Sequence, residues 1–267
     1  IELNADNFLV YNVPEDQNSI FFGKVYGSGK GILGGDEHEI NIDINMKTQP
    51  NTLVRMNLME DEINEYSFIT YKEPSEDVKD EGEPKIRKMT PIRAESGMNI
   101  NMNFYIDATP DATIEMVMDP VGGDILRGSG EGALQFVWSS KLAPQLFGTF
   151  NVNRGSYNFT FQRIMERKFS IKEGSTIQFR GDPFEATLDV NAIYKLTASL
   201  SDLDRSLVEQ SGQASLPVHC ILNLAGPLKK PSVGLDIAFP TANAEVARQI
   251  KSYMDTEDMI NRQVAYL

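Results

Sequence analysis

The chain has 267 residues, a formal net charge of −13 and a sequence pI near 4.7. This length permits one large all-β domain or two ordinary domains, with a sizeable core in either case. The negative charge argues against binding to nucleic acid or to anionic lipid headgroups, because both carry charge of the same sign. The single cysteine, Cys220, excludes an intrachain disulfide, and we expect it to be a small strand residue rather than a reactive thiol.

Apolar and polar residues alternate along much of the chain, which predicts β-strands. In the N-terminal part, strands are expected around 8–11 and 20–26, with a polar turn at 14–18 between them. A strand, a turn and a second strand follow at 40–58, and the same arrangement recurs at 98–118. This repeat predicts an elongated sheet that grows by addition of strand pairs.

A glycine-rich segment at 27–31 also recurs, at 128–132. A phosphate-binding loop would need a glycine where Lys24 stands and a hydroxyl residue after Lys30. The second copy has Glu131 in place of that lysine, which would repel phosphate. We therefore expect both segments to lie in strands or bulges where backbones pass closely.

Residues 73–91 differ from the rest of the chain, because charged residues, prolines and a glycine replace the alternating pattern. A segment without an apolar face cannot anchor itself to a core, so we predict a charged mobile surface loop. The alternative is a Ca²⁺ site. Ca²⁺ loops place oxygen ligands at fixed short intervals around a glycine, and this stretch lacks that pattern.

The stretch from 147 to 192 alternates most clearly, with four or five strands separated by glycine-containing turns. Each strand has one apolar and one polar face, which is typical of an antiparallel sheet with one solvated side. After a polar segment, two more strands are expected at 218–224 and 233–239.

The period changes in the last part of the chain, 241–267, which we predict to be helical. Thr241 is a candidate N-cap. The apolar residues that would share one helical face are Val246, Ile250, Tyr253 and Met254. We therefore divide the chain into a β-domain, 1–240, and a C-terminal helical segment.

The sequence does not suggest catalysis. Its two histidines, His38 and His219, have no histidine or cysteine partner at metal-ligand spacing. The carboxylates gather in loops, where solvation is more common than pairing for acid–base chemistry. We expect a protein that is not an enzyme and binds no metal or cofactor.

The most informative feature is a large apolar face. Its members alternate with polar residues on many strands, and they are our candidate groove-lining residues: Ile42, Ile44, Met46, Ile100, Met102, Phe104, Met116, Met118, Phe136, Trp138, Phe159, Phe161, Ile177, Phe179, Val190, Leu222, Leu235 and Ile237. A closed sandwich or barrel core would explain such a face. Two observations favour an open apolar groove: helical sequence that could cover a second face appears only after residue 240, and four of the eighteen residues are flexible methionines.

Seven stretches carry a family resemblance: GKVYGSGKGILGG at 23–35, TPDATIEMVMDPVGGDILRGSGEG at 109–132, GSYNFTFQ at 155–162, KFSI at 168–171, EGSTIQFRGDP at 173–183, ATLDVNAIY at 186–194 and LAGPLKKPSVGLDI at 224–237. They resemble the C-terminal region of the TamB family of AsmA-like bridge-type lipid transfer proteins, in particular its Bacteroidetes-like members. The resemblance implies an all-β fold, an elongated antiparallel sheet bent into an open apolar groove (a β-taco), followed here by the C-terminal helix.

The resemblance also implies a function in the periplasm of Gram-negative bacteria. Family members carry phospholipid between inner and outer membranes, and they work with an outer-membrane barrel of the BamA/TamA superfamily in translocation and assembly of outer-membrane proteins. They are anchored in the inner membrane by a segment far upstream. Since the chain begins at Ile1 without an initiator methionine, we expect it to be a piece of a longer protein.

Two alternatives remain open at this point. An open sheet edge could bind nascent outer-membrane polypeptide by strand addition, as a chaperone or scaffold does. A closed β-sandwich could have a purely structural role. Lipid carriage predicts a bound phospholipid or other amphiphile, whereas strand addition predicts backbone pairing along an unpaired edge.

Overall fold

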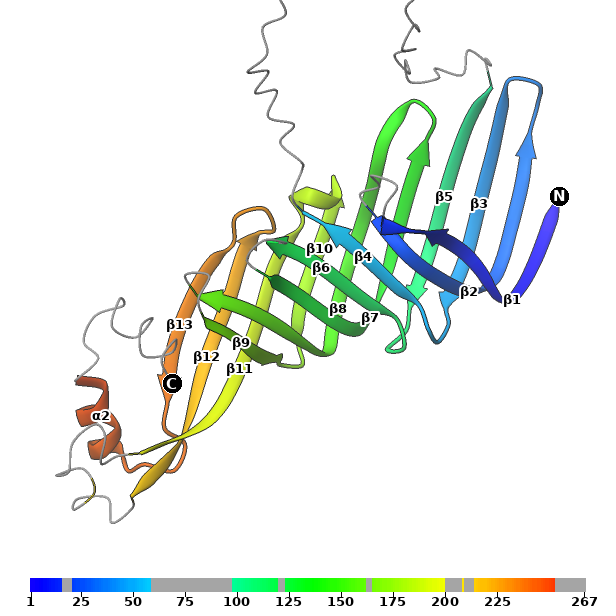
Figure 1. Cartoon of the computed structure of the whole chain (residues 1–267). Coiled ribbons are helices and arrows are strands. Elements are labelled where there is room, and N and C mark those ends of the chain that lie inside the picture. The colour runs from blue at the N-terminus through cyan, green and yellow to red at the C-terminus, as the bar shows by residue number, and fades with distance from the viewer. Residues whose placement is uncertain are drawn as a thin grey trace, which may run out of the picture.

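The structure, a computed structural model, describes residues 1–15, 21–58, 98–119, 123–161, 165–199, 208 and 214–252. These residues form a thirteen-stranded sheet and one C-terminal α-helix (Figure 1). The all-β class and the C-terminal helix are thereby confirmed. The charged segment predicted to be a loop, 73–91, lies outside the described residues.

The strands follow one another along the chain with few other elements. They are β1 (Glu2–Val13), β2 (Phe21–Gly35), β3 (Glu39–Thr48), β4 (Leu53–Asn57), β5 (Asn99–Ala108), β6 (Thr113–Asp119), β7 (Asp124–Ser139), β8 (Leu142–Phe161), β9 (Met165–Ile171), β10 (Ser175–Gly181), β11 (Thr187–Ser199), β12 (Ser215–Pro227) and β13 (Ser232–Ala238). A 3₁₀ turn, η2 (Pro183–Glu185), precedes β11, and the helix is α2 (Ala244–Ser252).

The sheet is folded lengthwise along a line that short turns mark. Strand pairs β3/β4, β5/β6 and β9/β10 are each interrupted there, at 49–52, 109–112 and 172–174. The long strands β2, β7, β8 and β11 cross the line without a break, so β2 pairs with β4 through Phe21–Lys24 and with β3 through Gly27–Gly35. We call β3, β5, β10 and the parts of the long strands paired with them the first wall. The second wall is β4, β6, β9 and the parts paired with those.

Strand pairing closes two rings in this sheet. The six strands β2, β3, β5, β7, β6 and β4 pair in that order, and β4 pairs back to β2. A smaller ring joins β8, β10, β11 and β9. Each ring forms because two long strands cross the fold line while the strands between them are interrupted by a turn. The rings close by strand pairing on both sides of the fold line, and the predicted open groove is not confirmed in these sections.

The prediction of a wholly antiparallel sheet is wrong in two places, because β3 pairs with β5 and β4 pairs with β6 in parallel. Ile42 lies beside Met102, and Met56 lies beside Met116. Both pairs are 60 residues apart, so the two copies of the strand–turn–strand repeat lie side by side in register. Alternation carries no strand direction, and the 41 residues between β4 and β5 suffice for the crossover that parallel pairing needs.

The two glycine-rich segments lie in β2 and β7. A Cβ atom on Gly29 would stand 2.0 Å from the Asn45 carbonyl oxygen, and one on Gly130 would stand 2.0 Å from that of Asn151. Side chains are therefore excluded by neighbouring backbone at both sites. The prediction that these glycines mark close backbone approaches is confirmed.

The core lies between the two walls. On the second wall, one row of directly paired side chains crosses five strands and is almost fully buried: Met56, Met116, Leu126, Tyr157 and Phe169. On the first wall, Met46, Ile106 and Leu134 are paired in a similar row. The buried cluster continues along the sheet as far as Val246 and Ile250 of α2.

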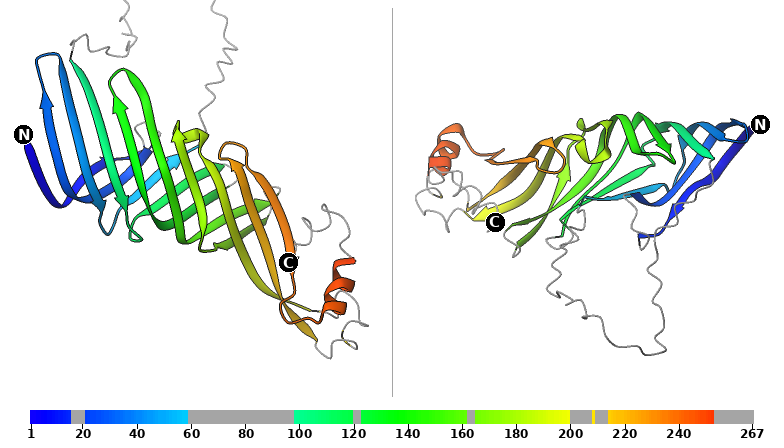
Figure 2. Two further views of the ribbon diagram at one scale, coloured as in Figure 1. Left: turned by 180° about the vertical axis from the view of Figure 1, so that it is seen from behind. Right: turned by 90° about the horizontal axis from the view of Figure 1, so that it is seen from above.

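Helix α2 lies at the end of the molecule opposite the N-terminus (Figure 2). Asn243 caps it, because the Val246 amide donates to Asn243 Oδ1 at 2.8 Å; the expected cap at Thr241 is wrong by two residues. Val246 and Ile250 are buried, as their helical spacing predicts, while Tyr253 and Met254 lie outside the described residues. Lys251 Nζ lies 3.2 Å from Asp236 Oδ1 on β13, which ties the helix to the sheet.

Candidate apolar binding site

A cavity of about 200 Å³ lies between the two walls, lined mainly by the six strands of the larger ring and also by β1, β8 and β10. Its lining comes from β1 to β8, β10 and two turns: Val10, Tyr11, Phe21, Val25, Met46, Thr48, Thr52, Val54, Met56, Phe104, Ile106, Ala108, Ala112, Thr113, Ile114, Met116, Leu134, Phe136, Leu146, Phe150 and Phe179. These residues are nearly all apolar, and none of them is an acid, a histidine or a basic residue.

The few polar groups of the lining are already hydrogen-bonded to the protein. Thr52 Oγ1 donates to the Tyr26 carbonyl at 3.1 Å, and Thr48 Oγ1 pairs with Thr109 Oγ1 at 3.0 Å. The Tyr11 hydroxyl donates to the Phe21 carbonyl at 2.5 Å. A ligand therefore meets mainly hydrocarbon, and such a surface selects for apolar chains without fixing their position.

Small residues make room for the cavity at the fold line. Thr48 and Ala108 lie just before the two turns of the repeat, while Thr52 and Ala112 lie just after them. All four line the cavity, so they form its floor. The larger side chains stand on the walls above, among them Met46 and Phe104 on the first wall and Met116 on the second.

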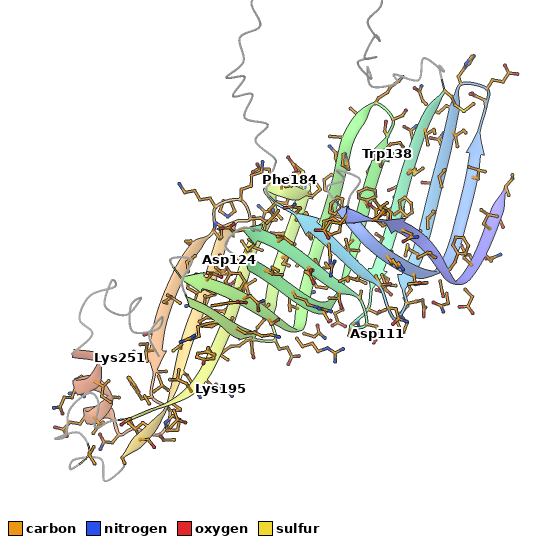
Figure 3. The ribbon with its side chains drawn as sticks, viewed as in Figure 1. Asp111, Asp124, Trp138, Phe184, Lys195 and Lys251 are labelled. Atoms are coloured by element: carbon orange, nitrogen blue, oxygen red, sulfur yellow. The ribbon has the colours of Figure 1, made fainter. Side chains whose placement is uncertain are left out.

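Five of the eighteen predicted groove-lining residues line this cavity: Met46, Phe104, Met116, Phe136 and Phe179. Five more lie on the same face of the first wall, farther from the fold line, and are half-buried: Ile42, Ile44, Ile100, Met102 and Trp138. We call this second group the lip. Figure 3 shows Trp138 in its upper part, toward the hairpin between β7 and β8.

Most of the other predicted residues lie in the packed core that continues along the sheet toward α2. Ile177, Val190, Leu222 and Ile237 are buried there, and Met118, Phe159 and Leu235 pack against it while partly exposed. The side chain of Phe161 lies outside the described part. The apolar face is therefore divided between a cavity, a half-exposed lip and an ordinary core.

Sequence reasoning missed the cavity residues of β1 and β2, namely Val10, Tyr11, Phe21 and Val25. All four lie in the strands that the sequence predicts at 8–11 and 20–26, and Phe21 and Val25 alternate there with Gly23 between them. The floor residues could have been found from the repeat, because small residues occupy matching positions in both copies.

Outside the cavity, several ionisable groups have structural partners. On the outer face of the second wall, Glu115 lies 2.9 Å from Arg55 Nε and 3.8 Å from Arg127 Nη1. Burial raises the pKa of the Asp124 carboxyl, although that carboxyl accepts hydrogen bonds from the Thr160 amide and the Tyr157 hydroxyl.

Burial also raises the pKa of the Cys220 thiol to about 11. The thiol is fully buried on β12, which agrees with its predicted role as a small strand residue. Within the described ranges, no three His, Cys, Asp or Glu side chains are grouped so that they could hold a metal ion. No described helix is long and apolar enough to cross a membrane.

The fold and the cavity define a class of protein: a long β-sheet, folded lengthwise, with an apolar interior. The family model of the TamB C-terminal domain matches residues 1–261, and the chain belongs to this family. No curated protein matches the sequence. Membership indicates an envelope-associated role in outer-membrane assembly together with outer-membrane partners, in a family of non-enzymatic transport and assembly proteins.

Proposed function

We propose that this domain carries phospholipid between inner and outer membranes by sheltering the acyl chains in its apolar interior. The observation that carries the proposal is the cavity, whose lining is nearly all apolar and whose hydroxyl groups bond to the protein itself. The half-exposed lip would extend this apolar surface toward an open groove. All eighteen predicted residues on that face, those in the packed core included, are candidates for contact with lipid along its path.

The energetics favour this cargo. Removing a methylene group from water contributes about 0.8 kcal/mol, so sheltering a sixteen-carbon chain contributes on the order of 10 kcal/mol. That is enough to hold a lipid in an aqueous compartment. Hydrocarbon walls have no directional groups, so a chain can move along them without breaking hydrogen bonds.

The setting follows from the family. We propose that the domain acts in the periplasm, as part of a protein anchored in the inner membrane. Its partner would be an outer-membrane barrel of the BamA/TamA superfamily, with which it supports translocation and assembly of outer-membrane proteins. Family membership supports these points.

A matched pair of variants tests lipid binding. Ile44 is a lip residue on β3, paired with Gly31 on one side and Phe104 on the other. Its neighbour Asn45, paired with Lys30, points to the opposite face of β3. Ile44→Asp places a carboxylate against the acyl chain, a barrier of several kcal/mol because alkyl groups cannot solvate it. Asn45→Asp adds the same charge on the other face.

The assay is labelling of the purified chain by a phospholipid with a photoreactive group in its acyl chain. We expect Ile44→Asp to lose labelling at least fivefold and Asn45→Asp to keep it within twofold, with β-type circular dichroism for both. Equal loss in both variants, or no loss in either, would refute the proposal. Asn101 is a poorer control site, because its amide donates to Glu39 Oε1 at 2.7 Å and an acid there would meet like charge.

Strand addition to a polypeptide client is the second candidate, and one observation favours it. In the described sheet, β1 pairs with β2 alone, and most of its residues are exposed. Its outer edge could therefore accept another strand. Crosslinking of an alternating client peptide to β1, in a chain that acquires no lipid label, would favour this function over lipid carriage.

A further inference from the structure

The two walls touch across the cavity through a pair of aromatic rings. Phe21 begins β2 and pairs with Met56, which places it on the second wall. Phe136 lies on β7 between Phe104 and Leu146, which places it on the first wall. Their ring centroids are 6.1 Å apart at an interplanar angle of 88°, an edge-to-face contact.

This contact lies on the side of the cavity away from the fold line. The cavity floor is formed by the small residues at the turns, and the row of Ile106 and Leu134 stands above it. Phe136 is one row farther out than Leu134, and the next row out is Met102 with Trp138 in the half-exposed lip. The two rings thus separate the cavity from the lip.

Neighbouring groups hold both rings in place. The Tyr11 hydroxyl donates to the Phe21 carbonyl at 2.5 Å and so fixes the start of β2. Phe104 packs beside Phe136, with ring centroids 6.0 Å apart. The link between the walls at this point is nevertheless a contact of side chains, so it can open by side-chain rotation while the strand pairing of the ring stays intact.

We propose that Phe21 and Phe136 form an aromatic latch that controls passage of phospholipid along the interior. The inference rests on the proposed function and adds a gate to it. A phospholipid that slides with its chains in the interior must keep its headgroup in water, so it needs a continuous slit along its path. Two rings in contact across that slit bar the headgroup, and the latch must open for the lipid to move on.

The latch makes a prediction that separates binding from movement. Phe21→Ala removes the contact, and Phe21→Leu does so with a smaller loss of apolar volume. We expect either variant to raise transfer of a fluorescent phosphatidylethanolamine between donor and acceptor vesicles at least threefold. Equilibrium binding of a pyrene-labelled fatty acid, measured in parallel, should not weaken in either variant, because a smaller side chain enlarges the cavity. Phe147→Ala is the control, because Phe147 is an exposed aromatic residue on the outer face of β8.

A locked variant tests the same latch in the other direction. Phe21→Cys combined with Phe136→Cys allows a reversible bifunctional thiosulfonate to join the walls, and the native Cys220 is buried. We expect the crosslink to lower vesicle transfer at least tenfold and a reductant to restore it.

Three results have distinct meanings. A wild-type chain that neither binds the fatty acid nor transfers lipid contradicts the proposed function itself. Binding and transfer by wild type, with transfer unchanged by opening and by crosslinking, overturns the latch alone. Faster transfer in Phe21→Ala or Phe21→Leu together with reversible loss in the crosslinked protein supports it.

Discussion

Enlarging the cavity should weaken the fold and strengthen ligand binding at the same time. Phe150 is fully buried on β8, lines the cavity and pairs with Ile177. Its ring lies against Gly130, since a Cβ there would come 3.0 Å from Phe150 Cε1. Phe150→Ala therefore removes a ring that has backbone close to it on one side and the cavity on the other.

The expected cost is about 3–5 kcal/mol of unfolding free energy, the usual range for truncating a buried phenylalanine. The neighbours are held by strand pairing, so the site cannot collapse to fill the space. The volume that the Phe150 ring vacates is added to the cavity of about 200 Å³. Each additional methylene group that a ligand can then bury contributes about 0.8 kcal/mol, roughly a fourfold gain in affinity.

Urea unfolding with and without a long-chain fatty acid measures both effects. Without ligand, Phe150→Ala should unfold at a lower midpoint with the slope unchanged. With ligand, the variant should gain more stability than wild type, because a tighter ligand stabilises the folded state more. Tyr105→Ala, on the exposed outer face, should change stability by about 0.5 kcal/mol or less. A cost below about 1 kcal/mol for Phe150→Ala, or equal ligand effects in both proteins, would contradict the placement of this ring between core and cavity.

Three further predictions concern single sites. Gly130→Ala should lower the free energy of unfolding by about 1–3 kcal/mol or more, because its Cβ would meet the Asn151 carbonyl oxygen at 2.0 Å. Gly34→Ala, which has open space around it, should be nearly neutral in the same urea assay. Equal losses of stability in the two variants would contradict the close backbone approach at Gly130. Burial raises the pKa of the Asp124 carboxyl, so the folded state holds the carboxyl proton more tightly than the unfolded state does. The free energy of unfolding should therefore fall as the pH rises through the raised pKa. Asp124→Asn should lack this loss when unfolding is measured from pH 3.5 to 7, and identical profiles for the two proteins would show that the carboxyl is solvated. Cys220, with a pKa of about 11 and no exposed surface, should not react with a thiol reagent at pH 8 until the chain unfolds, and rapid reaction of the folded chain would contradict its burial.

The sequence by itself determined which residues form strands and which side of each strand is apolar. Successive side chains of a pleated strand point to opposite faces, so apolar residues at every second position lie on the same face of the sheet. The same logic gave the face of α2, where Val246 and Ile250 are one turn apart and both buried. The repeat at 40–58 and 98–118 also predicted a real relation, since its copies lie side by side in register.

Only the tertiary structure decided what lies opposite each apolar face. Alternation does not encode strand direction, so the parallel pairing of β3 with β5 was not foreseen. It also does not reveal the fold line, which brings small residues such as Ala108 and Ala112 together as the floor of a cavity. Phe21 and Phe136 are far apart along the chain, yet their rings are in contact. The contact forms because β2 and β7 flank the two copies of the strand–turn–strand repeat and each of them crosses from one wall to the other. Local patterns report on neighbours within a strand, whereas a cavity and a contact across it depend on how the whole sheet is folded.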